Sequence, residues 1–457
     1  MSDFDISEYI KNKGTENAKK DEGCEFSDFI NLCEKIKATF FSDWERGESS
    51  RTNLEIQKRA IIGYEKEKSF YIDRIKQLIN EYSCQDVAYP SWYNSLEEGV
   101  YQENWGMAGL SEWFNDEFKT SSSAKIIGER IYFLKDGRMN LRPQKISPER
   151  KNQLIKAFLL LTPSERMDRS NYEVYLLDGT RVTIFTEPMA KKDQASLIFR
   201  RYLIPNLSFE EQAKRKTIPY ESIDFFKSMV QIGFNVVFMG AVRSAKTTFL
   251  STWQSYEDPC LEGVMVETDP EIPMHKILPN APILQLIADG DDLKNISKSL
   301  LRSDADYFIL AEARDGIALD TAVKLAAKGT KRMKITFHSR IAEHFPLEAA
   351  TEIVKSTGGD LHLTMQMVAS SFDYLFHLVQ LPNKNEKRLK GIYQMSLDEN
   401  NEIAIDKICS YNFETQSWTF NDLIGPIQRE YASETNPEAF SKFEKELKRL
   451  SLLKNVQ

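Results

Sequence analysis

The stretch FMGAVRSAKTTFL (238–250) carries Lys246, Thr247 and Thr248 at the end of a short loop that begins with Gly240. A loop of this kind, set between a strand and a helix, aims backbone N–H groups at one point where phosphate oxygens can bind. Lys246 is suited to neutralise the terminal phosphates of a nucleotide, and the Thr247 hydroxyl is suited to ligate Mg²⁺. These residues therefore predict a site for ATP and Mg²⁺.

The loop departs from the phosphate-binding pattern G-x-x-x-x-G-K-[ST] at two positions. Ala245 stands where the second glycine belongs, and Arg243 stands where many such loops have another glycine. Alanine adds one methyl group where the loop must approach the phosphates. Arg243 either adds a phosphate contact or blocks the cradle, and a chance strand–turn–helix is the alternative for this stretch alone. The residues predicted to contact the nucleotide here are Gly240, Ala241, Val242, Arg243, Ser244, Ala245, Lys246, Thr247 and Thr248.

Three further apolar stretches end in side chains suited to the same chemistry. They are VMVETDPEI (264–272) with Glu267, DYFILAEAR (306–314) with Glu312 and Arg314, and KITFHS (334–339) with Thr336 and His338. In a parallel sheet the carboxyl ends of the strands share one edge, where ligands bind. A lone histidine or an acidic run is usually structural, but three such ends behind one phosphate loop weaken that interpretation. The sequence predicts that the four strand ends surround a single triphosphate.

The elements that must position these residues alternate between strand and helix from residue 221 to residue 457. Such alternation is typical of a parallel α/β sheet of the P-loop type. Toward the end of the chain the pattern changes to hairpin-like strands and a charged helix. This part of the chain is therefore predicted to be the nucleotide-binding domain.

The earlier part of the chain has a different character. Residues 101–203 combine strand–turn–strand segments that contain Asp-Gly turns with one helix, which predicts a small α+β domain. Residues 1–100 are mostly helical in periodicity and predict an N-terminal extension. The aromatic-rich stretch over 89–114 favours a core. The polar, proline-flanked residues 204–220 predict a linker.

Composition limits the class of protein. With 60 basic and 68 acidic side chains the net charge is −8, which argues against a nucleic-acid binder that works through bulk positive charge. The five cysteines are scattered, which favours reduced thiols in a cytosolic protein. No stretch approaches the roughly 20 apolar residues that cross a bilayer, and the acidic, polar start does not predict a signal peptide.

On its motifs the chain resembles the type II/type IV secretion ATPases, or traffic ATPases, nearest the branch that serves type IV secretion and tight-adherence pili. GAVRSAKTT, VETDPEI, AEAR and TFHS stand in the order of the family's Walker A loop, aspartate box, Walker B segment and histidine box. LLDGTRV and LIFRRY resemble segments of the family's N-terminal domain. The resemblance covers residues 106–410. Departures include Thr268 and Asp269, exchanged in the aspartate box, and Thr330 in place of a histidine.

The resemblance implies a RecA-like P-loop ATPase domain, preceded by a small α+β (PAS-like) domain and a helical extension. It also implies roles for individual residues. Glu267 polarises the attacking water, Glu312 holds Mg²⁺ through water, and His338 senses the γ-phosphate. Arg181 and Arg200, from the preceding domain, reach over the nucleotide.

The resemblance further implies a hexameric ring that powers a secretion, pilus-assembly or conjugation machine. Its partners are inner-membrane components, and its place is cytoplasmic, peripheral at the inner face of the membrane. The alternative is a degenerate pseudo-ATPase that acts as an assembly scaffold, which Arg243, Ala245 and Thr330 favour. Direct translocation of nucleic acid has only family analogy behind it, because the sequence shows no basic stripe.

Overall fold

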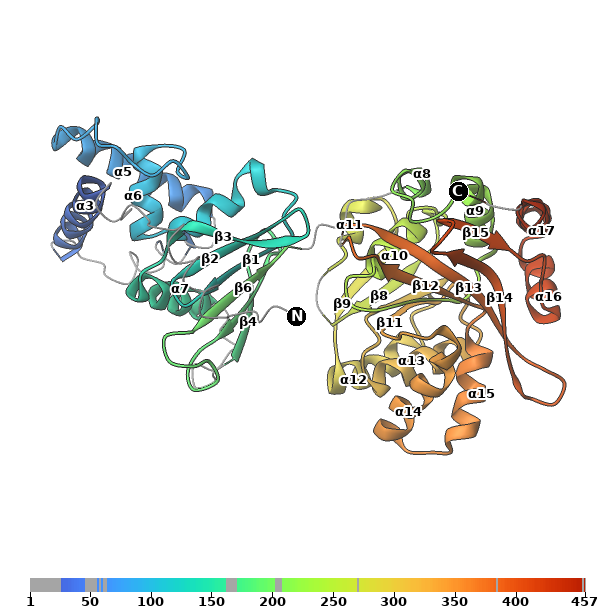
Figure 1. Cartoon of the computed structure of the whole chain (residues 1–457). Helices are drawn as coiled ribbons and strands as arrows, with labels where there is room; N and C mark the ends of the chain where they lie inside the picture. The colour runs from blue at the N-terminus through green and yellow to red at the C-terminus, as the bar shows by residue number, and fades with distance from the viewer. Residues whose placement is uncertain are drawn as a thin grey trace, which may run out of the picture. The chain divides into compact units, whose positions relative to one another are not determined.

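The computed structural model describes residues 26–45, 56, 59–60, 64–161, 171–201, 208–268, 271–383, 385–453 and 456. The chain forms two compact units, Met1–Leu203 and Ile204–Gln457 (Figure 1). Among the described residues, no helix combines the length and the apolar character needed to cross a membrane.

The first unit begins with a helical part. Its helices are α3 (Ser27–Glu45), α5 (Glu65–Glu81) and α6 (Leu96–Asn104). They pack around their own core, in which Tyr71 and Ile75 of α5 meet Trp105. The Phe40 ring lies 4.5 Å from the Trp105 ring, centroid to centroid. The aromatic residues after residue 89 are therefore part of a core, as their density indicates.

The rest of the first unit is a six-stranded antiparallel sheet with one long helix, α7 (Pro148–Leu161). The strands are β1 (Ser123–Ile127), β2 (Arg130–Lys135), β3 (Arg138–Lys145), β4 (Asn171–Tyr175), β5 (Arg181–Phe185) and β6 (Ser196–Arg200), in the order β3-β2-β1-β6-β5-β4. The turns η1 (Ala108–Phe114) and η2 (Asp116–Phe118) precede them. Buried residues alternate along β5 and β6, because only one face of the sheet meets the core. The predicted small α+β domain is confirmed.

The second unit is built on a nine-stranded sheet in the order β15-β14-β13-β12-β7-β11-β10-β8-β9. Six consecutive strands are parallel to one another: β7 (Val236–Met239), β8 (Gly263–Glu267), β9 (Ile283–Ile287), β10 (Tyr307–Ala311), β11 (Lys334–Phe337) and β12 (Tyr374–Gln380). Three antiparallel strands extend the sheet: β13 (Lys387–Leu397), β14 (Ile403–Asn412) and β15 (Ser417–Phe420). The central strands β7, β8 and β10 are buried along their whole length, because helices cover both faces.

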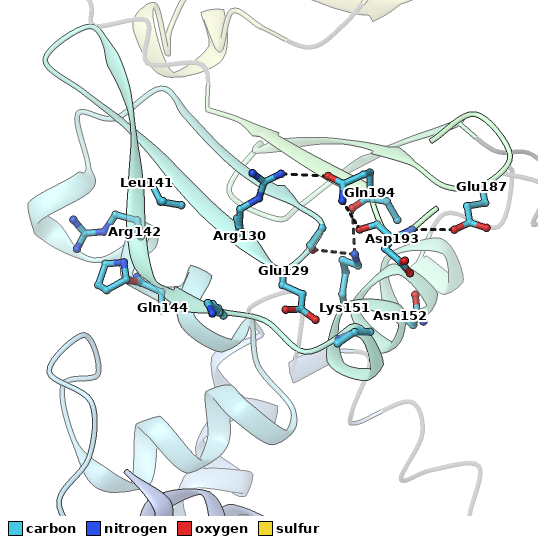
Figure 2. A pocket seen from close by; sticks show the side chains of 15 residues that line it. Glu129, Arg130, Leu141, Arg142, Gln144, Lys151, Asn152, Glu187, Asp193 and Gln194 are labelled. Carbon is cyan, nitrogen blue, oxygen red and sulfur yellow. Dashed lines mark hydrogen bonds between the residues drawn. The ribbon is translucent and has the colours of Figure 1, made fainter. Parts of the chain in front are cut away.

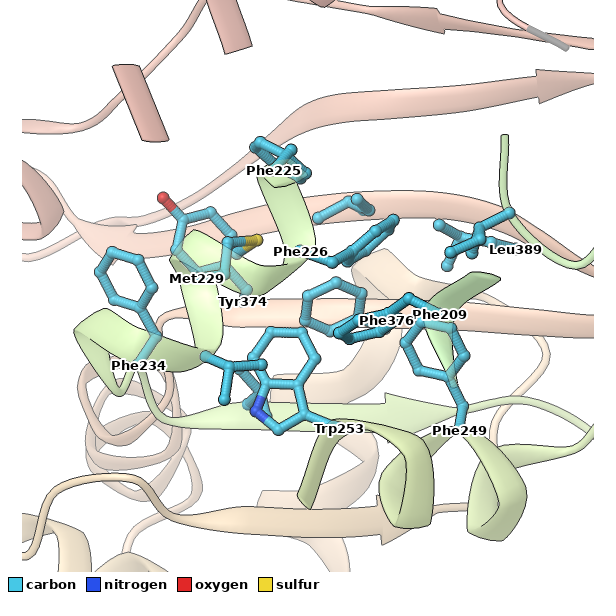
Figure 3. Close-up of a cluster of buried hydrophobic side chains, with 14 of the residues drawn as sticks. Phe209, Phe225, Phe226, Met229, Phe234, Phe249, Trp253, Tyr374, Phe376 and Leu389 are labelled. Atoms are coloured by element: carbon cyan, nitrogen blue, oxygen red, sulfur yellow. The ribbon is translucent and has the colours of Figure 1, made fainter. Parts of the chain in front are cut away.

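A layer of helices packs on each face of this sheet, and a hydrophobic core lies between each layer and the sheet. One layer contains α8 (Phe209–Lys214), α9 (Ile223–Ile232), α10 (Lys246–Gln254), α16 (Pro426–Thr435) and α17 (Pro437–Leu452). The other contains α12 (Gly290–Leu300), α13 (Gly316–Ala327), α14 (Phe345–Thr357) and α15 (Leu361–Ser371). Shorter helices are η3 (Tyr220–Ser222), α11 (Met274–Ile277) and η4 (Ala342–His344). Figure 3 shows the aromatic core under α9 and α10, where Phe226, Trp253 and Phe376 meet. The predicted RecA-like α/β fold is confirmed.

The segment predicted as a linker is in large part structured. Helix α8 begins after Ser208, whose hydroxyl accepts a hydrogen bond from the Glu211 N–H at 3.2 Å. Phe209 is fully buried, and its ring stacks on Tyr256 at 4.6 Å. Residues 208–220 therefore belong to the second unit, and 204–207 lie outside the described residues. The polar exposed face of α8 suggested a linker, but the burial of one aromatic side chain anchors it.

Candidate phosphate-binding site

The loop between β7 and α10 has the backbone of an anion cradle. Gly240 has a φ of 145°, while Arg243 and Ala245 have φ angles of 65° and 73°. The last two lie in the left-handed region, where glycine is the usual residue. The chain therefore keeps the conformation of a phosphate loop although two of its glycines are replaced. Holding non-glycine residues there costs on the order of 1 kcal/mol each.

Lys246 opens α10, and its side chain folds back into this loop. The ammonium donates hydrogen bonds to the carbonyls of Gly240 at 3.1 Å and Ala241 at 3.0 Å. It also lies 3.2 Å from His338 Nδ1. Burial lowers the pKa of Lys246 to about 8, although the charges of Glu312 and Glu271 oppose this shift. The cation is thus placed at the centre of the predicted site.

The other loop residues differ in exposure. Ala241, Val242 and Arg243 are exposed, and the half-buried Thr247 and Thr248 lie in the first turn of α10. Ser244 is fully buried, and its hydroxyl has no hydrogen-bond partner among the described residues. A buried hydroxyl without a partner is uncommon in folded proteins.

Glu312 follows β10 in a strained conformation, with a φ of 62°. Its N–H donates a hydrogen bond to the Thr336 hydroxyl of β11 at 2.7 Å. Its carboxylate lies 2.6 Å from the Arg314 guanidinium and 3.8 Å from His338 Nε2. Burial opposes ionisation, but the interactions with His338 and Arg314 outweigh it and lower the pKa of Glu312 to about 2. These interactions favour the charged form of the carboxylate.

Glu267 ends β8, opposite Ala311 in the neighbouring strand. Its side chain is buried, and Oε1 accepts hydrogen bonds from the N–H groups of Glu271 at 3.1 Å and Ile272 at 3.0 Å. Burial raises the pKa of Glu267 to about 8 against the effect of these two bonds. The two carboxylates at this edge therefore differ sharply in acidity.

Glu271 is a nearby acidic residue that the sequence analysis did not single out. Its charge acts on both Lys246 and Glu267. The sequence feature that points to this residue is its position as the second glutamate of VETDPEI. Asp269 of the same stretch lies outside the described residues.

The strand order explains why these side chains meet. β7, β11, β10 and β8 are consecutive in the sheet and parallel, so their carboxyl ends are spaced at about 4.8 Å along one edge. Met239 lies opposite Phe337, one residue before His338, and Leu310 lies opposite Ile335. The structure brings the four predicted strand ends together.

The two arginines predicted to reach over the nucleotide lie in the first unit. Arg181 on β5 and Arg200 on β6 are opposite one another in the antiparallel register. The Arg181 guanidinium forms an ion pair with Glu173. Their predicted role involves the other unit and stays a prediction.

A cavity of about 590 Å³ also lies in the first unit (Figure 2). The Lys151 ammonium donates hydrogen bonds there to the carbonyls of Gly128 at 2.9 Å and Ala195 at 3.3 Å. Arg130 donates to the Gln194 amide oxygen at 3.2 Å. Lys151 thus links α7 to the loops beside β1 and β6, and Arg130 links β2 to the loop that precedes β6.

No family model matches the chain, and no curated protein matches it. Solved structures similar to it include the VirB11 ATPase from the Brucella suis type IV secretion system in complex with sulphate. The sequence identity to this structure is 17%, the match covers 64% of this chain and 93% of that chain, and the TM-score is 0.34. The Legionella pneumophila ATPase DotB is 14% identical over 80% of this chain and 91% of that chain, with a TM-score of 0.45.

The pilus retraction motor PilT with bound ADP is 11% identical over 71% of this chain and 86% of that chain, with a TM-score of 0.42. A type IV secretion ATPase and a pilus motor thus occur among the similar structures. Because every TM-score is below 0.5, these likenesses add no weight to the site, which stands on the geometry described above.

Proposed function

We propose that the chain is an ATPase of the secretion and pilus motor type, which hydrolyses ATP at the loop between β7 and α10. The observation that carries this proposal is the position of Lys246. Its ammonium lies inside a loop of phosphate-cradle conformation, 3.2 Å from His338, and Glu312 is the next side chain along the edge. Such a cluster of basic and acidic groups at the carboxyl ends of parallel strands suits phosphoryl transfer to water.

The residues present fit ATP and Mg²⁺. Residues 243 and 245 have left-handed backbone conformations, and turns of this kind can form anion-binding concavities. Hydroxyl and carboxylate oxygens are the ligands that Mg²⁺ prefers, and the Thr247 hydroxyl and Glu312 supply one of each. When bound, Mg²⁺ neutralises charge on the terminal phosphates. The first step for the chain itself is to release Lys246 from the carbonyls of Gly240 and Ala241.

The two carboxylates divide the remaining work. Glu312, with its pKa of about 2, stays charged at neutral pH and suits a metal-holding role. Glu267, with its pKa of about 8, is close to the value at which a group accepts and returns protons efficiently near neutrality. We assign it to the attacking water, with Oε1 held by the loop that follows β8. The charge of Glu271 acts on Glu267 and on Lys246.

The test is ATP hydrolysis by the purified full chain with Mg²⁺. Lys246→Ala is expected to lower the rate by at least about a hundredfold, because the transition-state charge loses its cation. Lys294→Ala, on the exposed face of α12, is the matched control and is expected to keep the full rate. Equal background rates in the unsubstituted chain and in Lys246→Ala would contradict the proposal.

The second candidate function is a nucleotide-free scaffold. The observation that favours it is that the Lys246 ammonium donates to two loop carbonyls and lies 3.2 Å from His338 Nδ1. A loop satisfied in this way is stable without nucleotide. Calorimetric titration with ADP and ATP separates the two candidates, since a scaffold of this kind takes up neither.

We further propose that the chain works as a hexameric ring with inner-membrane components, at the cytoplasmic face of a secretion, pilus or conjugation machine. The support is the motif resemblance together with the site. Light scattering with and without ATP and Mg²⁺ is expected to show a mass near six chains, more populated with nucleotide. A monomer under both conditions would overturn the ring.

A further inference from the structure

Strand β3 is an outer strand of the sheet in the first unit, next to β2. Asp136 and Gly137, with φ angles of 51° and 74°, turn the chain from β2 into β3 and form a two-residue hairpin. In such a hairpin the pair beside the turn is hydrogen-bonded, and bonded pairs alternate with non-bonded pairs along the ladder. The backbone N–H and C=O groups of Met139 and Leu141 therefore face away from β2.

This edge of the sheet is uncovered. Met139 and Leu141 are 37% and 55% exposed. Within the part of the chain that the structure describes, their backbone groups form no hydrogen bond outside the pairing with β2. The outer strand β15 of the other sheet differs, because Trp418 and Val456 exchange backbone hydrogen bonds at 2.8 and 3.1 Å. An uncovered edge is a template on which a further strand can pair.

Two cavities flank β3. The cavity of about 590 Å³ that Figure 2 shows is lined by Leu141 and Pro143 of this strand. A second cavity, of about 470 Å³, is lined by Arg138 and Asn140. Successive side chains of a strand point to opposite faces of its sheet. A strand that pairs with β3 would therefore present alternate side chains to the two cavities.

The second cavity is the more basic one. Its charged lining residues are three cations and one acid: Lys135, Arg138, Arg142 and Asp136. Lys135 and Arg142 each pair with a glutamate, but Arg138 forms no ion pair with a described residue. Arg138 is also directly opposite Lys135 in the ladder. Like charges in this position destabilise the pairing, so this face of β3 favours an acidic neighbour.

The opposite face of β3 favours an apolar neighbour, because Met139 and Leu141 are its exposed side chains. The carboxylates that line the cavity on this face belong to loops outside β3: Glu129, Glu187 and Asp193. A second copy of β3 suits the edge poorly, since antiparallel pairing centred on Asn140 would place arginine opposite arginine. An extended segment in which acidic and apolar residues alternate matches both faces.

We propose that the free edge of β3 binds an extended segment of a partner protein, with alternating acidic and apolar residues, as a seventh strand of this sheet. The outward backbone groups of Met139 and Leu141 exchange hydrogen bonds with the segment. Its acidic side chains lie beside Arg138, and its apolar side chains lie beside Leu141. This site needs no nucleotide, so it is independent of the proposed ATP hydrolysis.

The experiment is a fluorescence-anisotropy titration of the full chain into a labelled octapeptide in which aspartate and valine alternate. A peptide with lysine in place of aspartate is expected to bind at least about tenfold more weakly. Leu141→Pro removes an outward N–H that the pairing with β2 does not use, and it is expected to raise the Kd about tenfold. Leu141→Thr keeps this N–H and is the matched control, with a change in Kd of less than about twofold. Arg138→Gln is expected to raise the Kd and to weaken its dependence on salt.

Hydrogen exchange of the unsubstituted chain keeps the test independent of how well Leu141→Pro folds. The aspartate peptide is expected to slow amide exchange in residues 138–142 and to leave β4, the other outer strand of this sheet, unchanged. Equal binding of the two peptides, or protection of another edge strand alone, would overturn the proposal. So would a dimer, seen by light scattering, that Leu141→Pro dissociates, because β3 would then pair with a second copy. Absence of ATP hydrolysis would count against the proposed function only.

Discussion

Gly240→Ala is expected to lower the free energy of unfolding by about 3 kcal/mol or more and to abolish nucleotide binding. The new Cβ would lie 2.1 Å from the Leu378 carbonyl oxygen and 2.7 Å from the Ser244 hydroxyl. The carbonyl belongs to the backbone of β12, which is paired with β7 and β13 and cannot move alone. The φ of 145° adds strain for any residue that has a Cβ. Urea unfolding curves measure the loss of stability.

Gly329→Ala is the matched control for this substitution. Gly329 also has a positive φ, 91°, but nothing lies within 4 Å of a Cβ placed there. Gly329→Ala therefore measures the effect of backbone strain without a steric clash, and this strain is expected to lower the free energy of unfolding by on the order of 1–2 kcal/mol. Equal losses in the two variants would show that the contact with Leu378 does not constrain the loop. Titration with ADP, at a urea concentration where both variants are folded, separates lost binding from lost stability.

Glu257→Gln is expected to lower the free energy of unfolding by about 3–5 kcal/mol, because it leaves two cations without their buried counter-ion. Glu257 follows α10, at the opposite end of this helix from Lys246. Its carboxylate lies 2.6 Å from the Arg332 guanidinium and 2.8 Å from the Lys334 ammonium. Lys334 is fully buried at the start of β11 and lies 4.5 Å from the centre of the Tyr307 ring. The ion cluster fixes α10 to the sheet.

Two further variants test this explanation. Adding Lys334→Met to Glu257→Gln removes one of the uncompensated charges and is expected to recover part of the lost stability. Glu352→Gln breaks an exposed pair with Lys355 and is expected to leave the urea midpoint nearly unchanged. If Glu257→Gln behaves like Glu352→Gln, the buried cluster does not anchor α10.

Most of the fold and the outline of the site follow from the sequence. Periodicity and the alternation of strands with helices predict a parallel sheet, and parallel strands present their carboxyl ends at one edge. The order of the four motifs was therefore enough to expect Lys246, Glu312 and His338 close together. No knowledge of side-chain contacts was needed, because the topology of the sheet enforces the proximity.

Only the tertiary structure determines which residues each side chain contacts and the direction in which it points. Lys246 turns to the carbonyls of its own loop and to His338, a residue distant in sequence. The polar segment that resembles a linker forms a helix at Phe209, because the Phe209 side chain packs into an aromatic core. Each of these outcomes depends on contacts between residues far apart in the chain. Local composition and spacing indicate strands and helices through their periodicity. They do not indicate the long-range packing that determines which side chains contact one another.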